Sequence, residues 1–365
     1  MFGALRFLLA YLVVVGHLVG TDYVAHFGFY AVRGFFVISG YLMTAALNEV
    51  YAFDGLRFWA NRALRLLPPY YVVCVATLIA VMLAPSQAAL FLKFWRGSPA
   101  VSDLVANVTV LPLQFAYSPF RLVPPFWSVA VEIDMYLLLF VIVSRRLAWA
   151  CIALCAGLSF QLVSSLDALG RGLDYFTAPS AVLPFAVGAV VYFVRQRGFV
   201  VGRTATAAAF VLWACNMAAG GALLPSSYIF GLGYFADTLC MAILVCGLAD
   251  CRDRVSPAPL MAVDAGLGEL SYFVFLSHWL AGFAASSVVP GGDQRGWALL
   301  AVATPITLAM SVAFSRLNRA VLEPLRDRIR GSAMGRPGLV WPNSPAAPAP
   351  GGIGVVPVVV RAKRP

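Results

Sequence analysis

Apolar residues in this chain are gathered into blocks of about 20 residues, the length that crosses ~30 Å of hydrocarbon as an α-helix. Short charged or Gly/Pro-rich segments separate the blocks. The blocks show no strict two-residue alternation, which disfavours a transmembrane β-barrel. The pattern predicts about ten transmembrane helices, near residues 4–20, 27–47, 70–84, 126–143, 147–166, 177–194, 205–224, 227–249, 266–289 and 297–315.

Composition indicates the same class of protein. Of the 365 residues, 61% are hydrophobic and 12% are charged, and the mean hydropathy is +0.84. A soluble domain of this length could not cover so much apolar surface, because its own exterior must face water. The chain is therefore predicted to be an all-α integral membrane protein surrounded by membrane lipid.

Charge predicts the orientation. A net charge of +10 would suggest nucleic acid as the partner of a soluble protein, but in a membrane protein Lys and Arg mark the cytoplasmic side. With the N-terminus inside, nineteen Lys and Arg residues fall in inner segments and five in outer loops. This difference predicts that both termini are cytoplasmic, and no nucleic-acid partner is expected.

The pattern divides the chain into two regions. Residues 1–315 form one predicted membrane domain, and its long outer loop, 85–125, carries six prolines and interleaved aromatic residues. Loops of that length are often functional, and this one is expected to form a partly re-entrant cap. Residues 316–365 are basic and Pro/Gly-rich, so a largely disordered cytoplasmic tail is predicted.

Charge inside hydrocarbon is costly, so each ionisable residue within a span is a candidate for function. Arg6 and His17 are eleven residues apart in the first span. Eleven helical steps return to within about 20° of the same face, ~16 Å farther along the helix. One face thus presents a cation near the cytoplasm and an imidazole in the outer half. A snorkelling arginine with a structural histidine is the alternative.

Two residues of other spans are expected at the depth of His17. Arg33 lies about two turns into the second span, and Glu132 lies at a comparable depth in the fourth. Tyr136 shares the helix face of Glu132. An Arg33–Glu132 ion pair that only fixes helix packing is the alternative.

The ninth span contains a third polar group. His278 lies near its middle and follows Ser271, Tyr272 and Ser277. These side chains either line a cavity or bond a neighbouring helix, and the sequence leaves both readings open. The seven cysteines lie in or beside spans and complete no ligand set, so no metal is expected.

Arginines gather at the expected inner face, where Arg57, Arg62 and Arg65 precede Pro68-Pro69. Arg62 and Arg65 lie on one helical side and can converge beside Arg6. Positive-inside signalling explains any one of them, but it does not explain their alignment. A bound polyanion such as the phosphate groups of CoA does explain it.

These motifs resemble the membrane-bound acyltransferase family 3, which includes bacterial O-antigen, exopolysaccharide and Nod-factor O-acetylases. Arg6 and His17 resemble its Arg-x10-His signature. Further likenesses are residues 34–42 to the FFVxSGxL block, 57–68 to the RxxRLxP segment, 127–136 to WSLxxExxFY, 271–278 to SYxxYLxH, and 323–324 to a closing Glu-x-Pro-like element.

The resemblance implies transfer of an acyl group, expected to be acetyl, from cytoplasmic acyl-CoA to a hydroxyl of a cell-surface or secreted carbohydrate. It also implies the bacterial cytoplasmic (inner) membrane. The catalytic residues implied are His17 and Glu132. The residues expected to bind acyl-CoA are Arg6, Arg57, Arg62 and Arg65. Those expected to bind the carbohydrate acceptor are Arg33, Trp127, Ser128, Tyr136, Ser271, Tyr272 and His278.

A proton-coupled exporter of a polysaccharide or small-molecule precursor is the alternative function. Buried Arg, His, Asp and Glu residues also serve proton-coupled transporters. The sequence shows no evident inverted repeat, and the order of the motifs favours acyl transfer.

Overall fold

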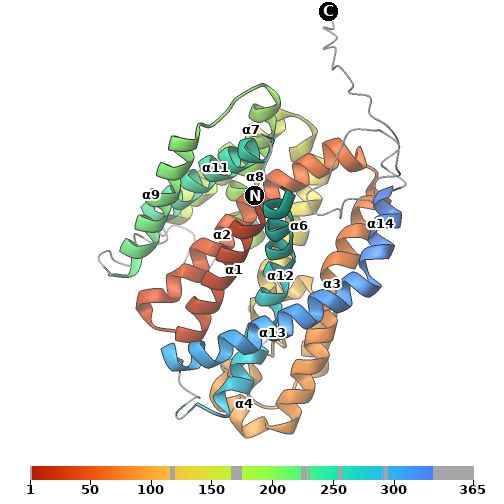
Figure 1. Ribbon diagram of the computed structural model, residues 1–365, viewed down its shortest axis with the longest axis vertical. Coiled ribbons are helices and arrows are strands. Elements are labelled where there is room, and N and C mark those ends of the chain that lie inside the picture. The colour runs from red at the N-terminus through yellow and green to blue at the C-terminus, as the bar shows by residue number, and fades with distance from the viewer. Residues whose placement is uncertain are drawn as a thin grey trace, which may run out of the picture.

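The computed structural model describes residues 2–115, 120–165, 175–222, 228, 231–253, 258–289, 291 and 295–331. These residues form a helical bundle, and no strand occurs among them (Figure 1). The long helices are α1 (Phe2–Val19), α2 (Asp22–Ala45), α3 (Gly55–Leu83), α6 (Trp127–Val141), α7 (Leu147–Ser165), α8 (Ala178–Gln196), α9 (Arg203–Ala222), α11 (Leu232–Asp253), α12 (Ala258–Ser286) and α13 (Trp297–Val321). The predicted all-α membrane fold is confirmed.

Nine of the described helices are long and apolar enough to cross a membrane. They are the long helices named above except α9, with α2 extended by the π-helical turn Ala46–Tyr51. Helix α9 corresponds to the predicted span 205–224. Asn216 and many small residues lower the mean hydropathy of this helix. Its exposed side chains nevertheless include Phe210, Val211 and Leu212, as expected for a face that meets lipid.

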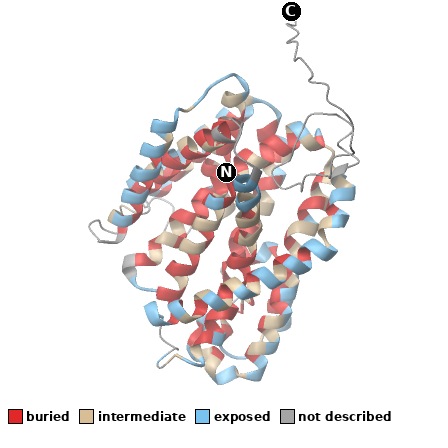
Figure 2. Ribbon diagram, viewed as in Figure 1, coloured by how far each residue is buried: buried red, intermediate tan, exposed pale blue. Residues whose placement is uncertain are grey.

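The middle of the bundle is buried, whereas much of the outer surface of α9 and α13 is exposed (Figure 2). Helix α1 lies between α2 and α12 and packs closely against both. Glycines allow this approach, since a Cβ atom on Gly16 would lie 3.1 Å from the backbone nitrogen of Gly28 on α2. A Cβ atom on Gly3 would overlap the backbone of Asp264 on α12. Small residues at such contacts let helices pack where lipid offers no hydrophobic drive.

Helix α3 differs from its prediction. It begins at Gly55 and continues through Pro68 and Pro69, whereas residues 70–84 were predicted. Asp54 caps its first turn by accepting a hydrogen bond from the backbone N–H of Arg57. The arginine-rich segment is therefore part of a rigid helix, which fixes the spacing and direction of its side chains.

The long loop that was predicted on the outer side contains the short helices α4 (Pro85–Phe91) and α5 (Val101–Thr109) and three 3-10 turns in its described part. Trp95 is 1% exposed and its indole N–H donates to the carbonyl oxygen of Arg121 at 2.8 Å. Phe126, at the end of the loop, stacks on Tyr70 of α3 with ring centroids 3.7 Å apart. The loop is thus packed into the protein where it enters α6.

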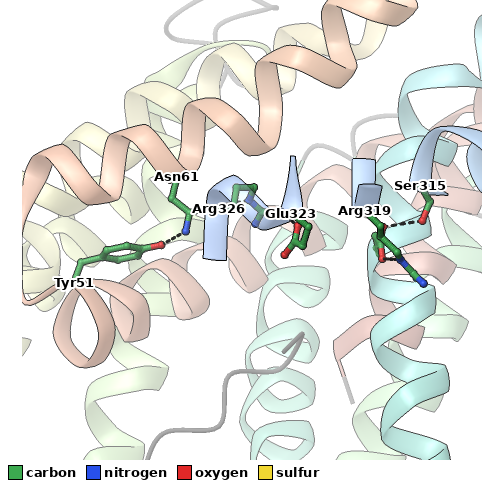
Figure 3. A network of polar contacts seen from close by, with 7 residues as sticks. Tyr51, Asn61, Ser315, Arg319, Glu323 and Arg326 are labelled. Carbon is green, nitrogen blue, oxygen red and sulfur yellow. Dashed lines mark hydrogen bonds and ion pairs between the residues drawn. The ribbon is translucent and has the colours of Figure 1, made fainter. Parts of the chain in front are cut away.

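The region predicted to be a largely disordered tail, residues 316–365, begins with helical structure. Helix α13 continues to Val321 and α14 (Glu323–Gly331) follows. Residues 332–365 lie outside the described ranges. Arg326 of α14 donates to the side-chain oxygen of Asn61 on α3 at 3.0 Å, and Asn61 donates to the hydroxyl of Tyr51 (Figure 3). These contacts place the end of α13 beside the start of α3.

Candidate active site

A pocket opens between α1, α2, α3, α6 and α12. Its apolar lining consists of Val32, Phe35, Phe36, Ile38, Leu42, Met43, Leu66, Val129 and Phe275. The polar lining consists of Arg6, Ser39, Arg62, Arg65, Ser128, Glu132, Tyr136, Ser271 and Tyr272. All of these polar residues except Ser39 were expected from the sequence to take part in the site, and the structure brings them together from five helices.

Three arginines and one carboxylate give the pocket lining a net positive charge. Arg6 comes from α1, and Arg62 and Arg65 come from successive turns of α3. Arg6, Arg62, Arg65 and Glu132 all line this one pocket, which brings the four charged groups together. Arg62 is 4% exposed, and its Nε–H has no acceptor among the residues that the structure describes. A buried guanidinium with an unused donor favours an anionic ligand.

Glu132 is held within this pocket. Its carboxylate accepts a hydrogen bond from the hydroxyl of Ser39 on α2 at 2.6 Å and another from Tyr136, one turn along α6. Both donors hold the carboxylate among the arginines. Ser39 was missed by the sequence analysis, although it lies inside the block 34–42 that was singled out there.

The expected common depth of Glu132 and His17 is wrong. Glu132 lines the same pocket as Arg6, and eleven helical residues, ~16 Å, separate Arg6 from His17. The prediction that the two residues share a depth requires Trp127, at the start of α6, to lie at the membrane boundary. Residues 124–126 before it are buried against α3, so α6 begins deep inside the protein.

His17 pairs with His278 across the interface of α1 and α12. Its Nδ1 lies 2.9 Å from Nε2 of His278, and the rings are nearly parallel with centroids 5.2 Å apart. The Trp279 ring lies 5.3 Å from His17, and the guanidinium of Arg295 lies over the Trp279 ring at 5.0 Å. His278, which was expected to bind the acceptor, is fully buried outside the pocket lining, and both of its ring nitrogens bond within the protein.

One end of the pocket lies close to this histidine pair. The side chain of Phe275 lines the pocket, and its carbonyl oxygen lies 2.8 Å from Nδ1 of His278. Val32, also in the lining, is one turn of α2, ~6 Å, from Gly28, which faces Gly16. The end of the pocket is therefore about one helical turn from His17.

Three expected site residues lie elsewhere. Arg57 pairs with Asp54 at 3.2 Å on the surface at the start of α3, outside the pocket lining. The guanidinium of Arg33 lies 3.1 Å from the ring centroid of Tyr234 on α11, so the alternative of a packing pair with Glu132 is also wrong. Trp127 packs on Tyr175, with centroids 5.2 Å apart.

Tyr175 lies in the connection between α7 and α8, outside the membrane-spanning helices. It is 4% exposed, and this burial raises the pKa of its phenol above the ordinary value, which keeps it neutral. Trp127, Tyr175 and Arg33 therefore form a packed cluster separate from the pocket. Within the described ranges, no three His, Cys, Asp or Glu side chains come together as a metal site.

Comparison with known proteins gives a family for this architecture. Residues 2–316 match the family described as acyltransferase domain. A protein of Komagataeibacter xylinus, provisionally named membrane-bound transacylase BcsY, is 25% identical over 331 residues, covering 84% of this chain and 81% of that protein. No solved structure matches the chain.

Proposed function

We propose a reaction for this chain from the premise that it belongs to the acyltransferase family, whose domain it matches over residues 2–316. The proposed reaction is transfer of an acyl group from cytoplasmic acyl-CoA to a carbohydrate hydroxyl. The observation that carries the proposal is the arrangement along α1. A pocket lined by three arginines lies at Arg6, and an imidazole lies three turns farther along the same helix at His17. A long donor with an anionic head and a reactive tail matches this spacing.

The arginine pocket is the proposed site for the head of the donor. Removing three guanidinium groups from water is costly unless anions compensate them, and Glu132 supplies only one negative charge. Phosphate groups would supply the rest, and guanidinium groups bind them through paired hydrogen bonds. Apolar lining residues such as Val32, Phe36 and Phe275 would accommodate the uncharged arm of the donor.

His17 is the proposed general base. The acceptor hydroxyl loses its proton to the imidazole while its oxygen attacks the thioester carbonyl carbon. The carbon–sulfur bond then breaks, and the proton passes from the imidazolium to the thiolate, so that an ester and free CoA thiol leave. A neutral imidazole performs this exchange near pH 7, which no other side chain of α1 can do at its usual pKa.

The acceptor is proposed to approach His17 from the packed outer loop. Phe91 of α4 contacts the Trp279 ring at 5.9 Å, and Trp279 in turn contacts His17. Gln87 of the same helix donates to the hydroxyl of Ser286 at 2.9 Å, which ties the loop to the end of α12. Aromatic faces and polar groups beside a reactive imidazole suit a carbohydrate.

Acyl-CoA binding tests this assignment through a matched set of arginines on one helix. Arg62→Ala and Arg65→Ala should each weaken binding of acetyl-CoA roughly ten- to a hundredfold, because each charge-assisted contact contributes about 1.5–3 kcal/mol. Arg57→Ala removes the same charge outside the pocket and should bind like the wild type. The measurement is the acetyl-CoA-dependent thermal shift of protein purified in detergent.

Two results would contradict the assignment. Unchanged affinity in both pocket variants would leave these arginines with a topological role only. A wild-type protein that gains no stability from acetyl-CoA would favour the exporter, which has no need of that ligand.

Topology gives a second test. Arg326 contacts Asn61 near the start of α3, and Arg65 of α3 shares the pocket with Arg6. The C-terminal end of α13 and the N-terminal end of α1 therefore lie at the same end of the bundle. An even number of crossings is then required, and α9 must cross as well. A reporter active only in the cytoplasm should be active when fused after residue 331. Activity of an alkaline phosphatase fused there would place that end outside and overturn the assignment.

A further inference from the structure

The proposed function leaves open which nitrogen of His17 takes the proton and what selects it. A neutral imidazole has one N–H and one lone pair, and only the nitrogen with the lone pair can act as a base. The nitrogen that carries the proton is determined by the hydrogen bond that the other one makes. For His17 that partner is His278, which belongs to α12 and lies 261 residues away in the chain.

The protonation of His278 follows from its backbone contacts. Its Nδ1 lies 2.8 Å from the carbonyl oxygen of Phe275 and 3.3 Å from that of Val274. Carbonyl oxygens only accept hydrogen bonds, so Nδ1 of His278 must carry a proton. Within the described part of the chain no carboxylate bonds to either imidazole, and a second proton on this fully buried ring would create an uncompensated charge within the membrane. His278 is therefore neutral, with its lone pair on Nε2.

That lone pair determines the state of His17. The Nε2 atom of His278 can only accept, and it lies 2.9 Å from Nδ1 of His17. The Nδ1 atom of His17 must then be the donor, which leaves the lone pair of His17 on Nε2. We infer that His278 is a positioning residue that holds His17 in the Nδ1–H form and thereby makes Nε2 of His17 the base; this inference rests on the proposed acyl transfer.

The pair also has a role after proton transfer. When Nε2 of His17 takes the hydroxyl proton, positive charge spreads over the ring, and the existing bond from Nδ1–H to His278 becomes charge-assisted and stronger. The arrangement resembles the carboxylate that orients the histidine of a serine protease, but with a neutral partner. A neutral partner suits hydrocarbon, because it leaves no uncompensated charge while His17 is neutral.

Two substitutions of His278 separate the positioning role from packing. His278→Gln places an amide oxygen near the former Nε2, where it can accept from His17. His278→Asn places its amide near the former Nδ1, where it can still bond the Phe275 carbonyl but cannot reach His17. We expect the asparagine variant to lose about 10²-fold in transfer rate and the glutamine variant to recover most of it, with acetyl-CoA binding intact in both.

The ring nitrogen of His17 that carries the proton can be identified directly by NMR. The chain has only three histidines, so a sample labelled with ¹⁵N in histidine gives few ring signals by solid-state NMR in lipid. The wild type should show a protonated Nδ1 and an unprotonated Nε2 for His17, and His278→Asn should lose this preference. His26→Gln and the His278 variants assign the signals.

The outcomes separate this inference from the proposed function. A wild-type His17 with its proton on Nε2 overturns the inference, as does full transfer activity in His278→Asn. The expected nitrogen state in a protein that transfers no acyl group would support the histidine pair and reject only the proposed function. Loss of folding in both His278 variants would still leave the wild-type spectrum to decide.

Discussion

Replacing His17 by alanine is expected to lower acyl transfer by roughly 10²–10⁴-fold, the usual contribution of a positioned general base. Binding of acetyl-CoA should stay close to wild type, because the arginine pocket lies three turns away along α1. The measurement is ester formation by purified protein in lipid, with acetyl-CoA as donor, alongside the ester content of the polysaccharide from cells that carry each variant.

Another histidine, His26, provides the control. His26 is buried on α2, and its Nε2 lies 2.6 Å from the carbonyl oxygen of Met217 on α9, away from the pocket and the histidine pair. His26→Ala removes the same kind of side chain and should leave transfer unchanged once the protein is folded. A well-expressed His17→Ala strain with wild-type ester content would remove His17 from the mechanism.

The fold was largely predictable because lipid imposes a strong pattern. Each span needs about 20 apolar residues with all backbone groups bonded internally, and hydropathy alone detects such segments. The start of α3 was missed because Pro68-Pro69 indicates a boundary when read locally. In the structure the helix passes through both prolines.

The candidate site was predictable where helical period was sufficient. Arg62 and Arg65 are three residues apart and lie on one side of α3, whereas Arg57 is five residues from Arg62 and points about 140° away. The sequence therefore contained the signal that separates Arg57 from the pocket. The pairing of His17 with His278 had no such signal, because it depends on how α1 and α12 meet.

The Glu132→Gln variant is expected to bind acetyl-CoA more tightly and to be less stable without it. Glutamine keeps the shape and can still accept hydrogen bonds from Ser39 and Tyr136, so only the negative charge is lost. The buried Arg62 and the half-buried Arg6 and Arg65 then lack their carboxylate. Breaking a fully buried ion pair costs about 3–5 kcal/mol, which is the upper bound for this partly exposed cluster. Thermal unfolding with and without acetyl-CoA measures both effects.

Two further variants define the cause. Asp134→Asn removes the same charge two residues along α6, where Gln114 bonds the carboxylate at 2.7 Å outside the pocket, and acetyl-CoA binding should not change. Adding Arg65→Gln to Glu132→Gln should restore part of the stability, because it removes one of the positive charges that lost its carboxylate. The stability effects of mutations at neighbouring charged residues are not additive. A catalytic Glu132 acting on His17 would give a different result: lost transfer with unchanged stability and unchanged acetyl-CoA binding. Since its hydrogen bonds run to Ser39 and Tyr136 among the arginines, the carboxylate is expected to balance the charge of the donor site instead.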